Sequence, residues 1–398
     1  MVERYLSTAS IVDRLAELGS ARWAVHFEAR RRAAAGEDII ELTIGEPDIA
    51  TPPGLINVAH EAMLAGRTGY AGGRGEKVLL DAVVDKYSKR TSRQITTENT
   101  IALPGTQAAL AISMLSMVEH GDAVLVPDPY YATYEAVVRA TGADFVPVPM
   151  NVENGFRLTV DQLEQAMVRN AKVLLLNSPH NPTGAVLNEA EIAAIGEFCL
   201  RHNLWILSDE VYEDLIYGKP FASPFDINEL ADITVATSSI SKSHAAPGFR
   251  SGWAVGPAWF VSKMQAVAES MLFGNQPFIA DMTAYALNNP DGTARQMAEA
   301  YRRRIDLLMT EFADCPGLEP LRPDSGMFMV VDVSATGMDG GRFARVLLEF
   351  GVAVMPGDSF GDQARDFIRL SLTVDDELLS EAARRIVSCA SAQMKDEQ

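Results

Sequence analysis

The sequence predicts an α/β protein in which a mostly parallel central sheet, covered by helices, is joined to a smaller α+β domain. Short apolar segments alternate with helical patterns between about residues 95 and 255, and such alternation is typical of parallel sheets. The pattern changes from about residue 290, where a long charged helix precedes a second group of strands. The 398 residues are enough for two domains with sizeable cores.

The first elements are a helix and five strands. Residues 10–35 have a helical pattern that ends at Gly36. Helices are expected between the strands, and the clearest follows Asn188, because Glu191 completes a capping box and apolar residues recur on one face. The five apolar strands are expected at residues 101–103, 123–126, 173–176, 205–207 and 233–237.

The second group of elements begins with a helix at residues 293–312. Strands are expected at 327–333, 352–355 and 367–370, and a final helix at 376–394. We therefore predict a large domain over residues 46–288 and a small domain made of residues 1–45 and 289–398. The N-terminal segment is assigned to the small domain because it has no core of its own.

Composition argues against several classes of partner and site. The net charge of −19 argues against nucleic acid and anionic membranes as partners, and no stretch has the roughly 18 apolar residues of a membrane span. Cys199, Cys315 and Cys389 are odd in number and lack CxxC spacing, so neither a disulfide framework nor a metal site is expected. The N-terminus leads into no apolar signal segment, so we expect a cytoplasmic protein.

Polar, aromatic and glycine residues follow every predicted strand of the large domain. Ligands of open α/β sheets bind beyond the carboxyl ends of the strands, so these segments are expected to meet at one edge. In strand order they are residues 104–107, 127–131, 177–184, 208–212 and the segment around Lys242. Chance would scatter such residues, and we therefore predict a binding site there.

Lys242 suggests the chemistry of this site. It lies in Ser239-Ile240-Ser241-Lys242, and Arg250 follows eight residues later. A lysine amine can form a Schiff base with an aldehyde cofactor, while hydroxyls and an arginine can hold that cofactor's phosphate. This combination suggests pyridoxal 5'-phosphate (PLP), which stabilises carbanions as an electron sink.

The other segments can supply the contacts that such a cofactor needs. Gly105-Thr106-Gln107 would begin a helix whose free N–H groups suit a phosphate. Asp209 can pair with a protonated pyridine nitrogen, Asn181 and Tyr212 can hydrogen-bond the ring hydroxyl, and Tyr131 can stack on the ring. Alone, each residue has an ordinary explanation as a turn, a cap, a core aromatic or a solvated charge. Only their joint placement favours a site.

These motifs resemble those of the class I/II aminotransferases, which are fold-type I PLP-dependent transferases of the aspartate aminotransferase superfamily. The resemblance covers nearly the whole chain. It rests on Asn181-Pro182-Thr183-Gly184, Asp209-Glu210-Val211-Tyr212, Ser239-x-x-Lys242 with Gly248-x-Arg250, and the late Arg369. The wider sequence, including residues 23–30, 178–181 and 241–244, most resembles bacterial arginine–pyruvate transaminases.

The resemblance implies a role for each residue. Lys242, Asp209 and Tyr212 would be catalytic: the Schiff-base lysine, the partner of the pyridine nitrogen and, with Asn181, a contact of the ring O3′. Tyr131 would stack on the ring. The phosphate ligands would be Gly105, Thr106, Gln107, Ser239 and Arg250.

The resemblance also implies a homodimer with shared active sites. Tyr70 would reach the cofactor phosphate of the neighbouring subunit. The substrate would be bound by Gly45, Asn181 and Arg369, the first and last at its α-carboxylate.

The activity that follows is transfer of an amino group from an L-amino acid to a 2-oxo acid, pyruvate or 2-oxoglutarate, by a ping-pong mechanism. Arginine–pyruvate and aspartate specificities both stay open, as do alanine and aromatic amino acids as substrates and a PLP-dependent C–S β-lyase on the same fold. A non-enzymatic PLP-binding module is a further alternative, but it would need an added DNA-binding segment. Glu46 and Asp48, near Gly45, could meet a basic side chain, although an acidic pair is common in this loop of the fold.

Two positions depart from the family pattern. Ser251 stands where the lysine signature usually has an apolar residue. Thr106 stands where some bacterial aspartate enzymes carry a lysine that helps to bind the substrate's second carboxylate. The second departure weakens the aspartate alternative.

Overall fold

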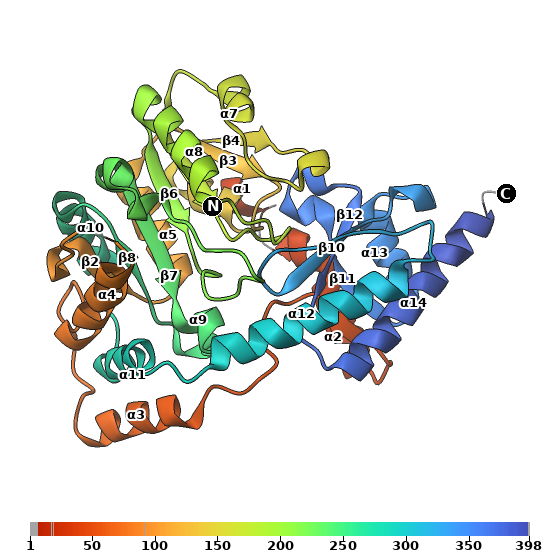
Figure 1. Cartoon of the computed structure of the whole chain (residues 1–398), viewed down its shortest axis with the longest axis horizontal. Coiled ribbons are helices and arrows are strands. Elements are labelled where there is room, and N and C mark those ends of the chain that lie inside the picture. Colours follow the sequence, from red (N-terminus) through yellow and green to blue (C-terminus); the bar gives the residue numbers. More distant parts are fainter. Residues whose placement is uncertain (1–6, 17, 19, 92, 397–398) are drawn as a thin grey trace, which may run out of the picture.

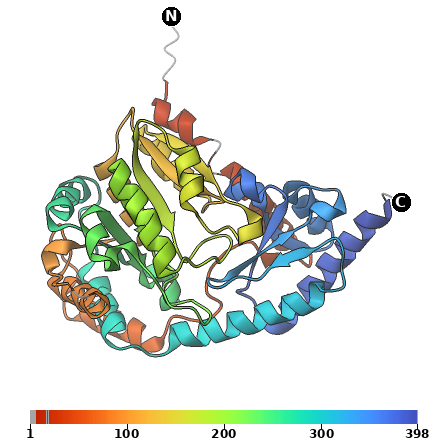
Figure 2. The same cartoon turned by 45° about the horizontal axis from the view of Figure 1, so that its top comes forward.

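Two β-sheets organise the chain in the computed structural model, which describes residues 7–396 except residues 17, 19 and 92 (Figure 1). One sheet has seven strands and the other has five. The long helix α12 (Thr293–Phe312) runs from the side of the larger sheet to the smaller one, as Figures 1 and 2 show.

The seven-stranded sheet has the order β2-β8-β7-β6-β5-β3-β4. All neighbouring pairs are parallel except those that β8 makes with β2 and β7. The predicted α/β class with a mostly parallel sheet is therefore confirmed. The strands are β2 (Thr100–Leu103), β3 (Ala123–Asp128), β4 (Asp144–Pro149), β5 (Ala171–Asn177), β6 (Trp205–Asp209), β7 (Thr234–Ser239) and β8 (Gly252–Val255).

Helices cover both faces of this sheet because successive strand residues point to opposite sides. On β3, Val124 and Val126 belong to one apolar cluster and Leu125 to another. The first face is covered by α5 (Thr106–Met117), α6 (Tyr134–Thr141) and α10 (Ala258–Met271). The other is covered by α7 (Val160–Ala166), α8 (Glu189–His202), α3 (Pro53–Leu64), α4 (Lys77–Arg90) and α11 (Pro277–Asn288). The predicted capping box of α8 is present.

The five-stranded sheet has the order β1-β11-β12-β10-β9. Its strands are β1 (Ile40–Leu42), β9 (Glu319–Leu321), β10 (Phe328–Asp332), β11 (Val352–Pro356) and β12 (Phe367–Ser371). A separate apolar core joins it to α12, α13 (Gly340–Glu349) and α14 (Asp376–Asp396). This is the smaller α+β unit that the sequence predicted.

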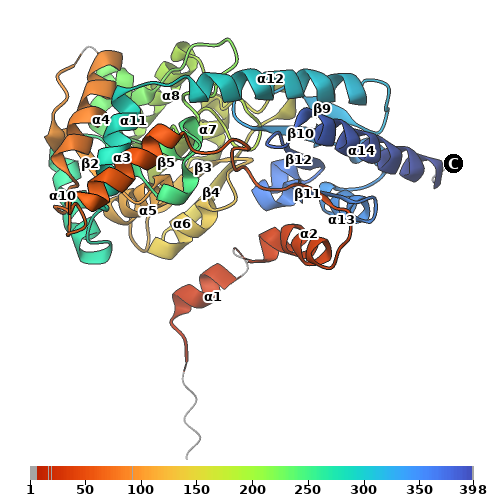
Figure 3. The same cartoon turned by 90° about the horizontal axis from the view of Figure 1, so that it is seen from below.

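The N-terminal segment differs from its prediction in two ways. The single helix expected over residues 10–35 is divided into α1 (Ser10–Ala16), a 3-10 turn (Ser20–Trp23) and α2 (Ala24–Ala34), while residues 17 and 19 lie outside the described part. Helix α1 contacts α6 beside the large sheet, where Arg14 Nε donates to the carbonyl of Arg139 at 3.1 Å. Only α2 packs on β11, so the segment is shared between the two units (Figure 3).

Candidate active site

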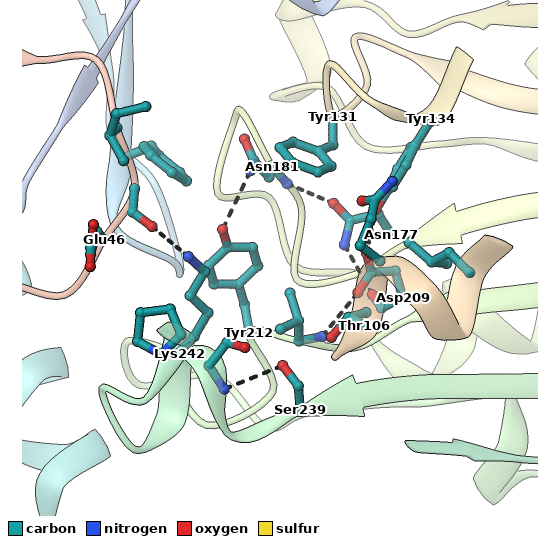
Figure 4. A pocket seen from close by; sticks show the side chains of 18 of the residues that line it. Glu46, Thr106, Tyr131, Tyr134, Asn177, Asn181, Asp209, Tyr212, Ser239 and Lys242 are labelled. Carbon is teal, nitrogen blue, oxygen red and sulfur yellow. Dashed lines mark hydrogen bonds between the residues drawn. The ribbon is translucent and has the colours of Figure 1, made fainter. Parts of the chain in front are cut away.

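A cavity of about 490 Å³ lies at the carboxyl ends of the parallel strands, where it also meets the five-stranded sheet (Figure 4). Its walls come from segments between Trp23 and Arg369, so distant parts of the chain converge on it. Of the predicted site residues, the cavity is lined by Gly45, Thr106, Gln107, Tyr131, Asn181, Asp209, Tyr212, Ser239, Lys242, Arg250 and Arg369.

Lys242 lies on the one-turn helix α9 (Ile240–Ser243) that directly follows β7. Its amine donates a hydrogen bond to the carbonyl of Gly45, on the segment that leaves β1 (Figure 4). Burial, together with the positive charge of Arg369, lowers the pKa of Lys242 to about 8. The amine therefore loses its proton much more readily than an ordinary lysine, as a nucleophile or a general base must.

Asp209 ends β6 and points into the cavity from the opposite side (Figure 4). One carboxylate oxygen accepts from the Tyr134 hydroxyl at 2.7 Å and the other from the Val211 backbone N–H at 3.2 Å. Burial raises the pKa of Asp209 to about 6. A buried carboxylate of this kind is stabilised by a cation placed against it, such as a protonated ring nitrogen.

Asn177, the last residue of β5, is hydrogen-bonded to both Asp209 and Asn181. Its Nδ2 donates to the carbonyl of Asp209 at 2.9 Å, and its Oδ1 accepts from the backbone N–H of Asn181 at 2.8 Å. Asn181 in turn donates from Nδ2 to the Tyr212 hydroxyl at 3.4 Å. These bonds fix the relative positions of Asp209, Asn181 and Tyr212 on one wall of the cavity.

The N-terminus of α5 forms another wall. Gly105 has φ +83°, and a Cβ at this position would lie 2.4 Å from a terminal nitrogen of Arg250, so the close approach requires glycine. The Thr106 hydroxyl is buried and has no hydrogen-bond partner in the described structure. Free N–H groups, an unpaired hydroxyl and a guanidinium together make a suitable anion site.

Arg369 is an unusual buried cation. Its terminal nitrogens donate to Oδ1 of Asn181 at 3.2 Å and to the carbonyl of Thr43 at 2.7 Å, while its Nε has no partner. Phe328 and Phe360 hold the guanidinium between their rings, with centroids 3.9 Å and 4.5 Å from its central carbon. Among the described residues it forms no ion pair, and burial lowers its pKa to about 10. Such a group favours binding of an anion, and its planar fork suits a carboxylate.

Gly45 completes this end of the cavity. A Cβ on Gly45 would lie 2.1 Å from the ring of Phe328, so a larger residue would displace the ring that packs on Arg369. Glu46, the next residue, also lines the cavity, whereas Asp48 does not. Asp48 is instead paired with Arg304 at 2.8 Å.

Of the predicted residues, Gly105 does not itself line this cavity but precedes the lining residue Thr106, whereas Tyr70 lies away from it. Tyr70 is 88% exposed and packs against Phe273, with ring centroids 4.9 Å apart, in a separate depression. The resemblance to the family implies that Tyr70 reaches a neighbouring subunit's site, and that assignment stays a prediction.

Several lining residues were not predicted: Trp23, Tyr134, Asn177, Ser241 and Phe328. Asn177 carried the same signal as the predicted residues, because it is the polar residue that ends β5. Tyr134 follows Tyr131 by three residues, and their rings form a T-shaped pair with centroids 5.6 Å apart. Trp23 and Phe328 had no signal, since they arrive from the N-terminal segment and the second sheet.

Ser251 turns out to have a polar partner. It is fully buried and accepts a hydrogen bond from the Thr283 hydroxyl at 2.7 Å, which joins the start of β8 to α11. A serine is therefore accommodated here without an unsatisfied buried hydroxyl.

Comparison with known proteins agrees with this geometry. Residues 37–386 match the model of the family described as aminotransferase class I and II. The chain belongs to the class I and II aminotransferases. This aminotransferase is 41% identical over 384 residues to the arginine–pyruvate transaminase AruH of Pseudomonas aeruginosa. The matched region covers 96% of this chain and 98% of that protein. The chain is 33% identical over 376 residues to the aspartate aminotransferase of Geobacillus stearothermophilus, covering 92% and 95% of the two chains.

Solved structures give the same result for the fold of this aminotransferase. The aspartate aminotransferase of Thermus thermophilus with maleate superposes with a TM-score of 0.91 at 32% identity, covering 97% of this chain and all of that one. The Rhizobium meliloti aspartate aminotransferase superposes with a TM-score of 0.92 at 27% identity, covering 97% and 99%. The aminotransferase is thus a fold-type I enzyme of a PLP-dependent family, and it moves an amino group from an amino acid to a 2-oxo acid.

None of the described helices of this aminotransferase has the length and apolar character to cross a membrane.

Proposed function

We propose that this chain binds PLP in the cavity and uses Lys242 to transaminate an amino acid that carries a basic side chain. The observation that most supports the roles of PLP and Lys242 is the presence of two cations with lowered pKa values, the partly buried Lys242 and the buried Arg369, in one cavity with the buried acid Asp209. A lysine that readily loses its proton and an arginine without a counterion suit an aldehyde and a carboxylate, respectively.

The residues present fit the cofactor. The Thr106 hydroxyl, which lacks a partner, and the N–H groups of Thr106 and Gln107 would hold the phosphate, together with Ser239 and Arg250. The N–H of Gly105 already donates to the carbonyl of Leu103 at 2.7 Å, so Gly105 would contribute the close approach of the backbone. Asp209 would pair with the ring nitrogen, Asn181 and Tyr212 would contact O3′, and Tyr131 would stack on the ring. When bound, PLP supplies an electron sink that stabilises negative charge at the substrate's α-carbon.

The chain's own residues would supply binding and proton transfer. Arg369 would bind the α-carboxylate, which is common to the amino acid and the oxo acid, and would fix the α-carbon near Lys242. The Lys242 amine would then take the α-proton and deliver it to C4′ of the cofactor, because its lowered pKa suits a group that must both accept and donate. Asp209 would keep the ring nitrogen protonated throughout.

We propose arginine as the donor and pyruvate as the acceptor. The relative named arginine–pyruvate transaminase supports this choice through its identity over nearly the full length of both chains. The cavity supports it through its charges: the cationic lining residues Lys242, Arg250 and Arg369 all have proposed roles, which leaves none for a second carboxylate. Glu46 is acidic and lines the cavity, so it could face a guanidinium.

The aspartate aminotransferases among the relatives keep aspartate as the second candidate. A C–S β-lyase would use the same cofactor residues and is distinguished by its products, pyruvate and ammonia without an amino acceptor. Position 106 carries threonine instead of the lysine that some bacterial aspartate enzymes have there, and this counts against aspartate as the substrate.

We further propose a cytoplasmic homodimer in which Tyr70 reaches the partner's phosphate site. Its exposure and its aromatic neighbour Phe273, 63% exposed, support a role at a subunit interface. Division into a large domain of residues 46–288 and a small domain that includes residues 289–398 is supported by the two separate sheets, and β1 and α2 join the small domain, whereas α1 packs on the large one. Sedimentation analysis at several concentrations tests the dimer, and a species of monomer mass throughout would contradict it.

A screen of amino donors at fixed pyruvate and at fixed 2-oxoglutarate tests the substrate, with loss of PLP absorbance on adding donor as the readout. Arginine with pyruvate should give the highest kcat/KM. Lys242→Ala should keep its fold and lose activity by about 10⁴-fold or more, because the nucleophile and proton carrier are both removed. Wild-type activity in that variant would refute the proposed mechanism.

A further inference from the structure

A cluster of buried charges lies behind the ends of β6 and β7, outside the cavity. At its centre is Arg90, the last residue of α4, whose three guanidinium nitrogens each reach a different carboxylate. Its Nε lies 2.9 Å from Asp226, and its two terminal nitrogens lie 2.6 Å from Glu213 and 3.0 Å from Glu210. These four residues are called the Arg90 cluster below.

The Arg90 cluster is well enclosed. The side chain of Glu210 is fully buried and that of Glu213 is 6% exposed, while the guanidinium carbon of Arg90 lies 4.5 Å from the ring centroid of Tyr87. Buried ion pairs often add little net stability relative to apolar residues of similar size, since desolvation offsets much of their attraction. Stability alone therefore gives a weak reason for so many buried charges at one place.

Sequence neighbours relate the cluster to the active site. Asp209 faces the cavity and the next residue, Glu210, faces Arg90; Tyr212 faces the cavity and Glu213 faces Arg90. At Asp209 and Glu210 the two directions follow from the end of β6, because successive side chains of a strand point to opposite sides. Beyond it the chain turns, with the Glu213 N–H donating to the carbonyl of Glu210 at 2.9 Å, and the turn brings both glutamates to Arg90.

The same relation holds on β7. Ser239 lines the cavity, and Ser238 donates from its hydroxyl to Glu213 at 3.0 Å. Three residues to which we assign cofactor contacts, Asp209, Tyr212 and Ser239, are thus each preceded or followed by a residue that is bound into the cluster. A shift of either strand end would have to break these contacts.

We propose that Arg90 is a positioning residue: by holding Glu210 and Glu213, it fixes the ends of β6 and β7 so that Asp209, Tyr212 and Ser239 face the cofactor. This proposal rests on the proposed function, because it assigns Arg90 an effect on PLP. Arg90 itself lies outside the cavity lining.

The planar fork of Arg90 gives a sharp test. In Arg90→Lys the charge is kept, but a single ammonium cannot span three carboxylates that the guanidinium reaches separately. Arg157→Lys is the matched control, because Arg157 also forms a two-bonded pair with a glutamate, Glu191, and neither residue lines the cavity. The measurements are PLP affinity, the pH titration of PLP absorbance without substrate, and thermal unfolding.

For Arg90→Lys we expect PLP affinity to fall about tenfold and the absorbance titration to shift, because small displacements of contacting groups have large effects. Arg157→Lys should match the wild type in both measurements. Wild-type affinity and an unshifted titration in folded Arg90→Lys would overturn the positioning role while leaving the proposed function intact. Failure of the wild-type chain to bind PLP would overturn both.

If Arg90→Lys does not fold, Glu210→Gln tests the positioning role of Arg90 instead. Glutamine keeps the size of the side chain and can still hydrogen-bond Ser208 and Ser223, but it loses the charge that binds Arg90. A PLP affinity at least about threefold weaker supports the proposal, and an unchanged affinity overturns it.

Discussion

The partly buried Arg90 and the buried Arg369 have opposite surroundings. Arg90 is paired with three carboxylates, and these raise its pKa against the effect of burial. Arg369 has no carboxylate partner among the described residues, and burial lowers its pKa to about 10. Both side chains lie against aromatic rings, so the difference lies in the counterions.

The charge of Arg90 is balanced by carboxylates of the chain itself, whereas the charge of Arg369 is left for an anionic ligand to balance. The attractions of Arg90 are satisfied within the chain, and it can act on the site only through its neighbours. The fold holds Arg369 with two neutral acceptors and leaves Nε unsatisfied, which is costly until an anion binds. Counterions thus distinguish structural from ligand-binding arginines more clearly than burial does.

The strongest test of this comparison is removal of the paired arginine. Arg90→Met should lower the free energy of unfolding by about 3–5 kcal/mol, because three carboxylates would lose their shared partner in a buried place. Urea denaturation measures this loss, with Arg157→Met as a control expected to cost about 1 kcal/mol or less. A loss of under about 1 kcal/mol for Arg90→Met would show that the cluster is not electrostatically coupled.

The unpaired arginine should matter for activity instead. Arg369→Lys should lower kcat/KM for every amino acid and oxo acid by about 100- to 1,000-fold, because an ammonium cannot make the bidentate contact with a carboxylate. Steady-state kinetics with two different donors checks this, since the loss should be similar for both. A loss confined to one donor would place Arg369 at the substrate's side chain.

The pH dependence of stability extends this comparison of charged groups to Lys242, a second cation of the cavity whose pKa is lowered. Its pKa is about 8 in the folded chain and 10.5 in an ordinary setting. Below pH 8 both states hold the proton, and the folded state bears the full cost of the buried charge. Between pH 8 and 10.5 the unfolded state binds more protons, so stability rises with pH.

The ligand-free enzyme should therefore gain about 3 kcal/mol from this group between pH 8 and 10.5. Chemical denaturation at several pH values, with Lys242→Met compared at each, isolates the contribution because other titrating groups are common to both proteins. Parallel stability curves for the two proteins would contradict a lowered pKa of Lys242 in the folded chain.

The smallest expected effect has the opposite sign to that of Arg90→Met. Arg369→Met should stabilise the ligand-free enzyme by about 1–2 kcal/mol, because an uncompensated buried charge is removed. The gain is modest since Asn181 and the carbonyl of Thr43 each lose a donor. Thermal unfolding without ligands measures it, and a large destabilisation would make Arg369 a structural residue like Arg90.

Four strands were not predicted from the sequence: β1, β4, β8 and β9. β1 and β8 have only three and four residues, whereas β4 and β9 share another physical feature. The strands β4 and β9 lie at the edges of their sheets and contain prolines, Pro147 and Pro320. Edge strands tolerate a residue that cannot donate a hydrogen bond, and the same prolines conceal the strand pattern. Buried central strands such as β6 and β7 have no such constraint, and their apolar runs were predicted to within a few residues.

The candidate site was predictable where strand ends supply it. Gly105, Asp209 and Lys242 follow their strands directly, so topology brings them together. Phe328 and Trp23 reach the cavity through packing between the two sheets, which no local pattern records. Arg369 was assigned only through the resemblance to the family. Its proposed role depends on the lack of an ion-pair partner in the folded chain, and no local sequence pattern shows that.

The pairing of β1 with β11 has a consequence for the time course of synthesis. Ile40 pairs with Val352, about 310 residues later in the chain. At about 5–20 residues per second, the ribosome needs about 15–60 s to make the intervening segment. The strands that carry Asp209 and Lys242 emerge during this interval, so the cofactor half of the site can assemble before the carboxylate half, with Arg369, has been translated.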